Sequence, residues 1–486
     1  MDLLDRIDRW ARLAPNRLAH VSADRSLTYA ELVRRSDGLA AHLAEALPDD
    51  RSPVAVLGHK EPDMLVAFLG AAKAGHPYIP LDTALPPHRV ERIVSAAGAR
   101  LTLTPSSVAA LRARPSGLRS RRLGPHDPYY VMFTSGSTGE PKGVVITLKC
   151  LASFVNWMLA EQGLAERSET FLNQVPYSFD VSLMDTYLGL VTGSTVVSVT
   201  AEQIANPNLL YRALAASGVT IWVSTPSFAE MCVVERGFGA SMLPRLRKFL
   251  FCGETLAPEL AAELLDRFPG AEVWNTYGPT EATVATTSVR VDRDLLADYS
   301  PLPIGYPMPG ARVLVFDERG QAVEDGQRGE IVIAGPNVSP GYLGRPDLTE
   351  RAFFELDGQR AYRTGDWGRC RDGMLFFEGR MDNQIKLHGY RIELADVEAN
   401  LRTLPGVRDA VVVPVLRQRR PHALRAFVIL ANRSPGSDFE ISNALRAQLA
   451  ERLPAYMLPR KFSFLEAFPM TVNGKADRRQ LAESIA

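Results

Sequence analysis

This sequence has few cysteines, no formal net charge and no long apolar runs, and each of these features argues against a class of protein. The chain has four cysteines in 486 residues, far apart and with no CxxC pair: Cys150, Cys232, Cys252 and Cys370. This argues against a disulfide framework and against a zinc site. Basic and acidic residues number 55 each, so the formal net charge is zero, and neither nucleic acid nor an anionic membrane is favoured as a partner.

Signals for membrane insertion and secretion are also missing. The longest apolar runs, such as residues 410–415, are too short to span a bilayer. The start of the chain, MDLLDRIDRWARLAP, has no basic segment followed by an apolar stretch, which predicts a cytoplasmic location. Lysine is scarce because arginine carries almost all of the positive charge. That bias, with abundant alanine, is typical of a GC-rich genome, and it makes each lysine a candidate for a specific role.

The spacing of apolar residues predicts an α/β protein with more than one domain. A chain of 486 residues is too long for a single compact core. Early in the chain, helices such as residues 29–47 and 64–74 alternate with apolar strands such as 53–57, which indicates doubly wound, largely parallel sheets. We therefore expect a large N-terminal domain over residues 1–381.

Two later segments differ from this pattern. From about residue 310 the strands are shorter and separated by Gly and Asp turns, which predicts a small β-rich subdomain over about 310–381. Residues 382–486 have the length and pattern of a small α+β domain. The elements expected in it are helices at 394–402 and 441–452 and strands at 410–415, 424–430 and around residue 462.

The segment FTSGSTGEPKG, residues 133–143, follows the strand-like YYVMF and has the composition of a phosphate-binding loop. Its N–H and O–H groups suit a polyphosphate, and Lys142 adds a positive charge. It is not a GxxxxGK[ST] loop, because no Lys-Ser or Lys-Thr follows the glycines at that spacing. A solvent-exposed Gly/Ser turn is the alternative interpretation. The candidate ligands are Thr134, Ser135, Gly136, Ser137, Thr138, Gly139 and Lys142.

The loop resembles that of the adenylate-forming (ANL) superfamily, which includes acyl-CoA synthetases, luciferases and the adenylation domains of nonribosomal peptide synthetases. Other strings resemble the superfamily in order and spacing and together cover nearly the whole chain: KAGHPYIPLD (73–82), NTYGPTEATV (275–284), YRTGDWG (362–368), GRMDNQIKLHGYRIEL (379–394) and NGKADR (473–478). Within it, three strings resemble the D-alanine–carrier protein ligases: LNQVPYSFDVSLMDTY (172–187), STPSFAEMC (224–232) and FLFCGE (249–254). The resemblance implies a stand-alone enzyme that forms an aminoacyl-AMP from ATP.

The resemblance implies roles for single residues when a carboxylate attacks the α-phosphate of ATP. Both partners are anions, so the site must supply positive charge and orientation. Lys475 is implied to lie between the substrate carboxylate and the α-phosphate, and Arg380 to reach the sugar or the phosphates. Glu281 is implied to bind the Mg²⁺ of MgATP, because a hard carboxylate oxygen suits that ion. A surface lysine is the alternative for Lys475.

Three further residues are implied to bind the nucleoside. Tyr277 offers a flat face for adenine, and Asn275 offers an amide for its edge. Asp366 is implied to accept hydrogen bonds from the ribose hydroxyls, where one carboxylate engages both. Core packing is the alternative for Tyr277, and an ordinary turn residue is the alternative for Asp366.

Thioester formation requires a second arrangement, since a thiol must reach the carbonyl that pyrophosphate shielded. In the family, a small mobile C-terminal domain rotates about an Asp, here Asp382. One state is implied to bring Lys475 to the site. The other presents the loop 386–391, where Gly389 leaves room for the incoming pantetheine arm.

The substrate class depends mainly on Asp180, in SFDVS, where amino-acid-activating members keep the carboxylate that pairs with the substrate ammonium. A buried unpaired carboxylate is costly, so Asp180 favours an amino acid over a fatty or aryl acid. An N-cap for a helix over 182–190 is the alternative. The resemblance implies a narrow apolar pocket for an alanine-sized side chain, lined by Val181, Met184, Ser224, Leu250, Cys252, Thr276 and Val284. The sequence does not decide whether the substrate is a D- or an L-amino acid.

The sequence ends about ten residues after NGKADR with no carrier or condensation segment, so we expect an acyl or peptidyl carrier protein in trans. D-alanine activation for cell-wall modification is favoured by the motifs. L-alanine, glycine or another small amino acid for a natural-product pathway is favoured by the Arg- and Ala-rich composition, with a carrier thiol or a carrier-bound aminoacyl amine as acceptor. Asp180 disfavours an acyl- or aryl-CoA ligase. Retention of Lys475, Glu281 and Asp366 disfavours a non-catalytic adenylate-binding regulator.

Overall fold

The structure is a computed structural model that describes residues 2–23, 25–48, 50–111, 122–136, 140–165, 168–387, 389–417, 420–431, 436–471 and 476–485. The chain divides into two compact units. The first comprises Met1–Asp82, Ala97–Met132 and Gly143–Met381, and the second comprises Thr83–Ala96, Phe133–Lys142 and Asp382–Ala486. Among the described helices, none is both long enough and apolar enough to cross a membrane.

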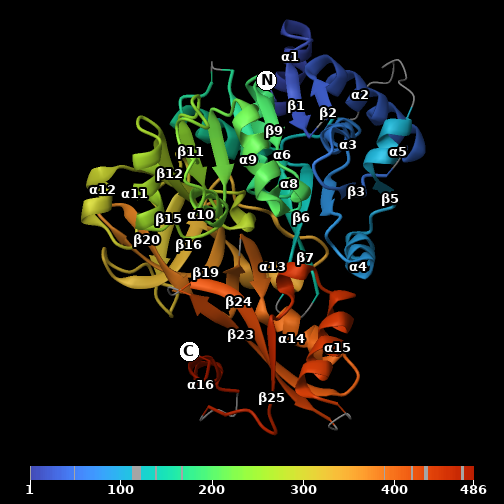
Figure 1. Ribbon diagram of the computed structural model, residues 1–486. Coiled ribbons are helices and arrows are strands. Elements are labelled where there is room, and N and C mark those ends of the chain that lie inside the picture. Colours follow the sequence, from blue (N-terminus) through green and yellow to red (C-terminus); the bar gives the residue numbers. More distant parts are fainter. Residues whose placement is uncertain are drawn as a thin grey trace. The chain divides into compact units, whose positions relative to one another are not determined.

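The larger sheet of the first unit has nine strands in the order β14-β13-β12-β11-β10-β8-β9-β1-β2. Their bounds in that order are Tyr306–Pro307, Thr287–Val291, Glu272–Tyr277, Lys248–Phe251, Ile221–Ser224, Thr170–Asn173, Thr195–Ser198, Leu18–Ser22 and Arg25–Thr28. Strands β1, β2, β9, β11 and β12 of this sheet are labelled in Figure 1. The run from β12 to β1 is parallel throughout. The carboxyl ends of β8, β10, β11 and β12 therefore lie along one edge of the sheet.

A second sheet has six strands in the order β17-β7-β6-β4-β3-β5. Their bounds are Gly341–Tyr342, Lys142–Thr147, Pro128–Thr134, Tyr78–Asp82, Val54–Gly58 and Leu101–Leu103. Strands β3, β4, β5 and β6 run parallel, as the alternation of helices and strands predicts.

Helices cover both faces of the nine-stranded sheet. On one face, α9 (Pro207–Ser217), α10 (Pro226–Val233) and α11 (Pro258–Arg267) pack on Trp222 and Phe249 in a single apolar cluster. The other face packs with a second cluster that contains α7, α6 and the fully buried α3. Their bounds are Ser182–Val191, Leu148–Glu161 and Pro62–Lys73. Burying each large apolar side chain contributes about 1.5–3 kcal/mol, and the doubly wound prediction is confirmed.

A local sequence signal marks the start of helix α2 (Tyr29–Ala46). The helix starts with a capping box in which Thr28 and Glu31 satisfy each other's backbone N–H groups. The other described helices of this unit are α1 (Leu3–Leu13), α5 (Pro105–Ala110), α8 (Ala201–Ala205), α12 (Arg293–Asp298), α13 (Pro346–Ala352) and the 3₁₀ turn η1 (Thr280–Ala282).

An antiparallel sheet occupies the segment where short strands are predicted. Its strands are β15 (Arg312–Phe316), β16 (Arg328–Ala334), β18 (Phe353–Leu356), β19 (Gln359–Arg371) and β20 (Met374–Arg380). This sheet contributes Asp366 from β19 and Arg380 from β20, which are paired across the two strands.

The second unit has its own apolar core, in which Ile392, Val397, Val428 and Leu449 are buried together. It has a two-stranded and a three-stranded sheet. Its elements are α4 (Pro87–Ala97), β21 (Gln384–Leu387), β22 (Tyr390–Glu393), α14 (Leu394–Arg402), β23 (Val407–Arg417), β24 (Arg420–Leu430), α15 (Asp438–Ala450), η2 (Ala455–Met457), β25 (Lys461–Phe464) and α16 (Arg478–Glu483). The predicted α+β character is confirmed, and helix 394–402 has the predicted bounds.

Candidate active site

The carboxyl ends of β10, β11 and β12 bring several predicted site residues into lateral register. Ser224 pairs with Phe251, and Phe251 pairs with Asn275. One residue further along, Cys252 donates its backbone N–H to Ser224 O at 3.3 Å. Ligands of open α/β sheets bind outside the carboxyl ends of the strands, so this edge is the candidate site.

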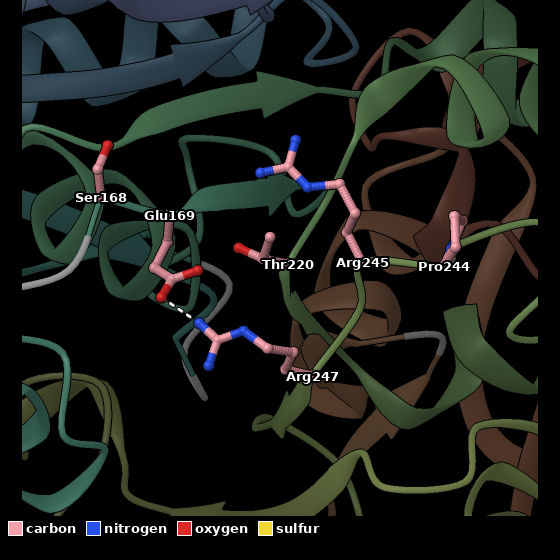
Figure 2. Close-up of a pocket in the computed structure, with 6 residues that line it drawn as sticks. All are labelled: Ser168, Glu169, Thr220, Pro244, Arg245 and Arg247. Atoms are coloured by element: carbon pink, nitrogen blue, oxygen red, sulfur yellow. Dashed lines mark hydrogen bonds and ion pairs between the residues drawn. The ribbon is translucent and has the colours of Figure 1, made fainter.

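A surface pocket lies at the opposite ends of the same strands (Figure 2). It is lined by Ser168, Glu169, Thr220, Pro244, Arg245 and Arg247. Glu169 immediately precedes β8, Thr220 precedes β10 and Arg247 precedes β11. Glu169 and Arg247 form an ion pair. This pocket is therefore at the amino ends of the strands, away from the edge that binds ligands in this class of sheet.

Five of the predicted substrate residues lie in one buried apolar cluster, with no more than 6% of any of them exposed: Val181, Met184, Leu250, Cys252 and Val284. One hydrogen bond and one close approach of the backbone at Gly253 show how near these residues lie to each other. Cys252 Sγ donates to Val284 O at 3.5 Å. Gly253 has φ 93°, and a Cβ placed there would lie 3.5 Å from Val181 Cγ2. The structure therefore brings these residues together around the end of β11.

Ser224 and Thr276 are buried but are held by other groups. Trp222 Nε1 donates to Ser224 Oγ at 2.8 Å, and Trp222 belongs to the cluster under α9–α11. Because side chains alternate along a strand, Ser224 points to that face and not toward Leu250. Thr276 Oγ1 donates to Phe251 O at 2.8 Å.

Asp180 lies in the turn that enters α7 and is partly exposed. Helix α7 begins at Ser182 with Val181 as its N-cap residue and with no side-chain cap. The alternative role of Asp180 as an N-cap is therefore not seen. Burial raises the pKa of Tyr130 well above its usual value, and the negative charge of Asp180 raises it further, so the Tyr130 hydroxyl lies within electrostatic range of this carboxylate.

Glu281 is completely buried in the 3₁₀ turn η1. Tyr342 Oη donates to Glu281 Oε1 at 2.8 Å, and Ser339 N donates to Glu281 O at 2.8 Å. The described residues contain no group of three or more His, Cys, Asp or Glu placed to hold a metal. A single fixed carboxylate suits Mg²⁺, which is held by one or two carboxylates together with substrate phosphates.

Tyr277, Asp366 and Arg380 form one connected group. Arg380 Nη1 donates to Asp366 Oδ1 and to Thr364 O, both at 2.7 Å. Tyr277 Oη donates to Asp366 Oδ2 at 2.5 Å, and burial together with the Asp366 charge raises the pKa of Tyr277 well above its usual value. Each carboxylate oxygen accepts two hydrogen bonds, so Asp366 retains acceptor capacity for ribose hydroxyls. Asn275 Nδ2 donates to Pro303 O at 2.8 Å.

The segment of the predicted phosphate loop, Phe133–Lys142, belongs to the second unit. Thr134 Oγ1 is buried and has no hydrogen-bond partner within the described part of the chain, as expected for a hydroxyl that binds a phosphate oxygen. Ser135 Oγ donates to Arg391 O and accepts from Glu393 N, both at 3.1 Å. Gly136 is buried and Lys142 begins β7. The predicted ligands Ser137, Thr138 and Gly139 lie outside the described residues.

Three further residues are predicted to act in catalysis, in rotation of the C-terminal domain or in transfer to the carrier protein. Asp382 opens the last segment of the second unit, and its Oδ1 accepts from Gln384 N at 3.1 Å. Gly389 has φ 84°, a conformation that favours glycine. Lys475 lies outside the described residues. The roles of all three stay predictions.

Sequence reasoning missed Tyr130, Asn337 and Tyr342. Asn337 is completely buried and donates to Ala282 O at 2.8 Å. Tyr342 lies in the string GPNVSPGYL and Tyr130 in YYVMF. YYVMF adjoins the predicted phosphate loop, which is the signal that points to Tyr130, whereas GPNVSPGYL adjoins none of the recognised motifs. Tyr342 meets Glu281 across 61 positions and Asn337 meets Ala282 across 55, and no local signal predicts such contacts.

Comparison with known proteins defines the class. Residues 7–343 match the AMP-binding enzyme family, and residues 396–475 match the AMP-binding enzyme C-terminal domain. The chain belongs to the AMP-binding enzyme family and is a ligase. The chain is 45% identical to the D-alanine–D-alanyl carrier protein ligase of Bacillus cereus (strain G9842) over 503 residues, covering 100% of both chains. The ligase of the same name from Bacillus anthracis (strain CDC 684 / NRRL 3495) is also 45% identical, over 502 residues.

Solved structures agree on the fold. The Vibrio cholerae adenylation domain AlmE, in complex with glycyl-adenosine-5′-phosphate, has a TM-score of 0.86 at 22% identity and covers 99% of this chain and 97% of its own. IdnL1 has a TM-score of 0.81 at 29% identity, covering 96% and 99%. Holo-PA1221, a nonribosomal peptide synthetase protein with adenylation and peptidyl carrier domains, has a TM-score of 0.83 at 28% identity, covering 99% and 84%.

Proposed function

We propose that this protein activates D-alanine with ATP as D-alanyl-AMP and transfers the D-alanyl group to the phosphopantetheine thiol of a separate carrier protein. The observation that carries the proposal is 45% identity over the whole of both chains to ligases named for D-alanine and D-alanyl carrier protein. The buried apolar cluster around Cys252 and Val284 supports it, because such a lining favours a methyl side chain. The proposed location is the cytoplasm, where ATP is available.

In the proposed adenylation step, a carboxylate oxygen of D-alanine forms a bond to the α-phosphorus of ATP. The bond from that phosphorus to the bridging oxygen breaks, and pyrophosphate leaves. Lys475 is proposed to stabilise the negative charge that develops on the α-phosphate oxygens. Glu281 would hold Mg²⁺, which when bound neutralises charge on the phosphates. Thr134 is proposed to donate its hydroxyl to a phosphate oxygen.

Orientation of the two substrates is assigned to two groups of residues. Tyr277 is proposed to stack on adenine while Asp366 accepts hydrogen bonds from the ribose, with Arg380 fixing that carboxylate. Asp180 is proposed to pair with the substrate ammonium. Holding two reactants in a productive geometry removes much of the entropic barrier to their reaction.

In the proposed transfer step, the thiol sulfur of the carrier forms a bond to the D-alanyl carbonyl carbon. The bond from this carbon to the AMP oxygen breaks, AMP leaves, and the thiol proton passes to solvent. Rotation of the C-terminal domain about Asp382 is proposed to precede this step, with Gly389 giving the pantetheine arm its path. The left-handed conformation of Gly389 supports a position where a side chain is excluded.

A second candidate uses the same chemistry on L-alanine, glycine or another small amino acid in a natural-product pathway. The Arg- and Ala-rich composition favours it. In that case the acceptor is a carrier thiol or a carrier-bound aminoacyl amine. Acyl- or aryl-CoA formation is the least supported, because those substrates bring no ammonium for Asp180 to neutralise.

The decisive experiment is ATP–pyrophosphate exchange against matched D- and L-amino acids, with glycine, fatty acids and aryl acids included. We expect D-alanine to give the highest kcat/KM. A preference for L-alanine or glycine would replace D-alanine with the second candidate. Turnover of a fatty or aryl acid above every amino acid would overturn the substrate class. Transfer from the adenylate to a holo carrier protein, and not to its apo form, tests the second step.

A further inference from the structure

Two consecutive residues beside the substrate cluster have a strained backbone. Thr283 has φ 54° and Val284 has φ 68°. The left-handed conformation is unfavourable for a residue with a side chain, and a β-branched side chain such as valine is rarely found there. Such a turn persists only where its surroundings hold it.

Asn337 supplies part of that support, through both its side chain and its backbone. Asn337 lies between β16 and β17 and is completely buried. Its Nδ2 donates to Ala282 O at 2.8 Å and to Thr286 Oγ1 at 2.9 Å. Its backbone O accepts from Thr283 Oγ1 at 2.7 Å. The three hydrogen bonds therefore hold the turn at Ala282, which precedes the strained residues, at Thr283, which is one of them, and at Thr286, which follows them.

The turn fixes a residue of the proposed pocket. The Val284 side chain is buried in the substrate cluster, and its carbonyl oxygen accepts from Cys252 Sγ at 3.5 Å. If the turn relaxed to ordinary backbone angles, both the side chain and the carbonyl would move. Cys252 Sγ would then lose this hydrogen bond, and the shape of the cluster would change.

We propose that Asn337 is a positioning residue for amino-acid selectivity, which acts by holding Thr283 and Val284 in the left-handed conformation. It works through Val284 and Cys252, because its hydrogen bonds are to Ala282, Thr283 and Thr286. This inference rests on the proposed function, because it assumes that Val284 and Cys252 line the amino-acid pocket. It adds a residue that lies more than fifty positions away in sequence from the turn it controls.

The test compares Asn337→Ala with a matched control, Thr192→Val. Thr192 is buried in the same unit, and its Oγ1 donates to Leu188 O at 2.7 Å and to Gly189 O at 3.0 Å. Both variants lose buried side-chain-to-backbone hydrogen bonds, so both are expected to lower Tm. In Asn337→Ala the ratio of kcat/KM for D-alanine to that for L-alanine is expected to fall about tenfold, a change of about 1.4 kcal/mol. Thr192→Val is expected to leave the ratio unchanged.

A milder variant, Thr283→Val, covers the case in which Asn337→Ala does not fold. It removes only the hydrogen bond to Asn337 O, and it is expected to lower the same ratio by about threefold with the KM for ATP unchanged. An unchanged ratio in every variant that folds would overturn the inference, as would an equal fall in Thr192→Val. The wild type is measured first. If it prefers another amino acid, the proposed function fails, and the ratio of that substrate to its nearest competitor tests Asn337 instead.

Discussion

Lys60 and Asp185 bind opposite ends of one buried amide. Lys60 Nζ donates to Asn173 Oδ1 at 2.6 Å, and Asn173 Nδ2 donates to Asp185 Oδ1 at 2.6 Å. Lys60 Nζ also donates to Val175 O at 2.5 Å and lies 4.3 Å from the centre of the Tyr177 ring. These contacts join the ends of two sheets to the segment that leads to Asp180.

Lys60→Met is expected to lower the free energy of unfolding, because the variant loses the buried hydrogen bonds from Lys60 Nζ to Asn173 Oδ1 and Val175 O. A buried acceptor left without its donor costs about 1–3 kcal/mol. Burial raises the pKa of Asp185 to about 8, so its carboxyl is protonated below that pH, and adding Asp185→Asn to Lys60→Met is expected to change the stability little. Calorimetry on the wild type, both single variants and the double variant checks this. A double variant much more stable than Lys60→Met alone would contradict it.

The Asp185 carboxyl is expected to make stability depend on pH. Burial raises its pKa to about 8, although the Lys60 charge opposes this shift. The folded protein therefore holds a proton that the unfolded chain releases above pH 4, so stability falls as the pH rises between about 4 and 8. Asp185→Asn removes this dependence. The Tm difference between Asp185→Asn and the wild type should grow more positive from pH 5 to pH 7, and a constant difference would refute it.

Lys475→Ala is expected to abolish amino-acid-dependent pyrophosphate exchange and to leave ATP binding nearly intact. A charge that acts as the transition state forms contributes several kcal/mol, which corresponds to about a hundredfold or more in rate. Exchange rates and the Kd for ATP are the two measurements. Exchange within tenfold of the wild type would assign Lys475 to the surface.

Asp180→Asn is expected to raise the KM for the amino acid sharply and to change the KM for ATP little. Loss of one partner of a buried charge pair costs about 2–5 kcal/mol, and because Asp180 is partly exposed the expected cost is at the lower end of that range. Steady-state kinetics with each substrate varied in turn checks this split. Equal changes in both KM values would point to a general disturbance of the fold.

Cys252→Ala is expected to broaden the substrate range toward larger or opposite-handed side chains. Its sulfur occupies the buried cluster with Met184, and one methyl in an apolar pocket is worth about 1–3 kcal/mol. Values of kcat/KM for D-alanine, L-alanine and D-serine, in wild type and variant, provide the readout. If the ratio of kcat/KM for D-alanine to that for L-alanine stays constant while adenylation persists, Cys252 is a packing residue and another group determines the chirality of the substrate.

Much of the fold could be predicted because its signals are local. The capping box at Thr28 and Glu31 begins α2, and the apolar spacing of residues 394–402 predicts α14. The position of Ser224 could not be read in the same way. A resemblance places Ser224 in a pocket, but the alternation of β10 and the bond from Trp222 turn its side chain to the other face.

The sequence by itself indicated the reaction class, because short strings such as FTSGSTGEPKG and YGPTE resemble those of adenylate-forming enzymes. Only the tertiary structure decided which distant side chains support those strings. Lys60 meets Asn173 across 113 positions, and Asn337 meets Ala282 across 55. The physical reason is that a buried polar group must find its hydrogen-bond partner wherever packing brings one. Local sequence sets propensity and chemistry, whereas burial and strand pairing between remote segments select the partner.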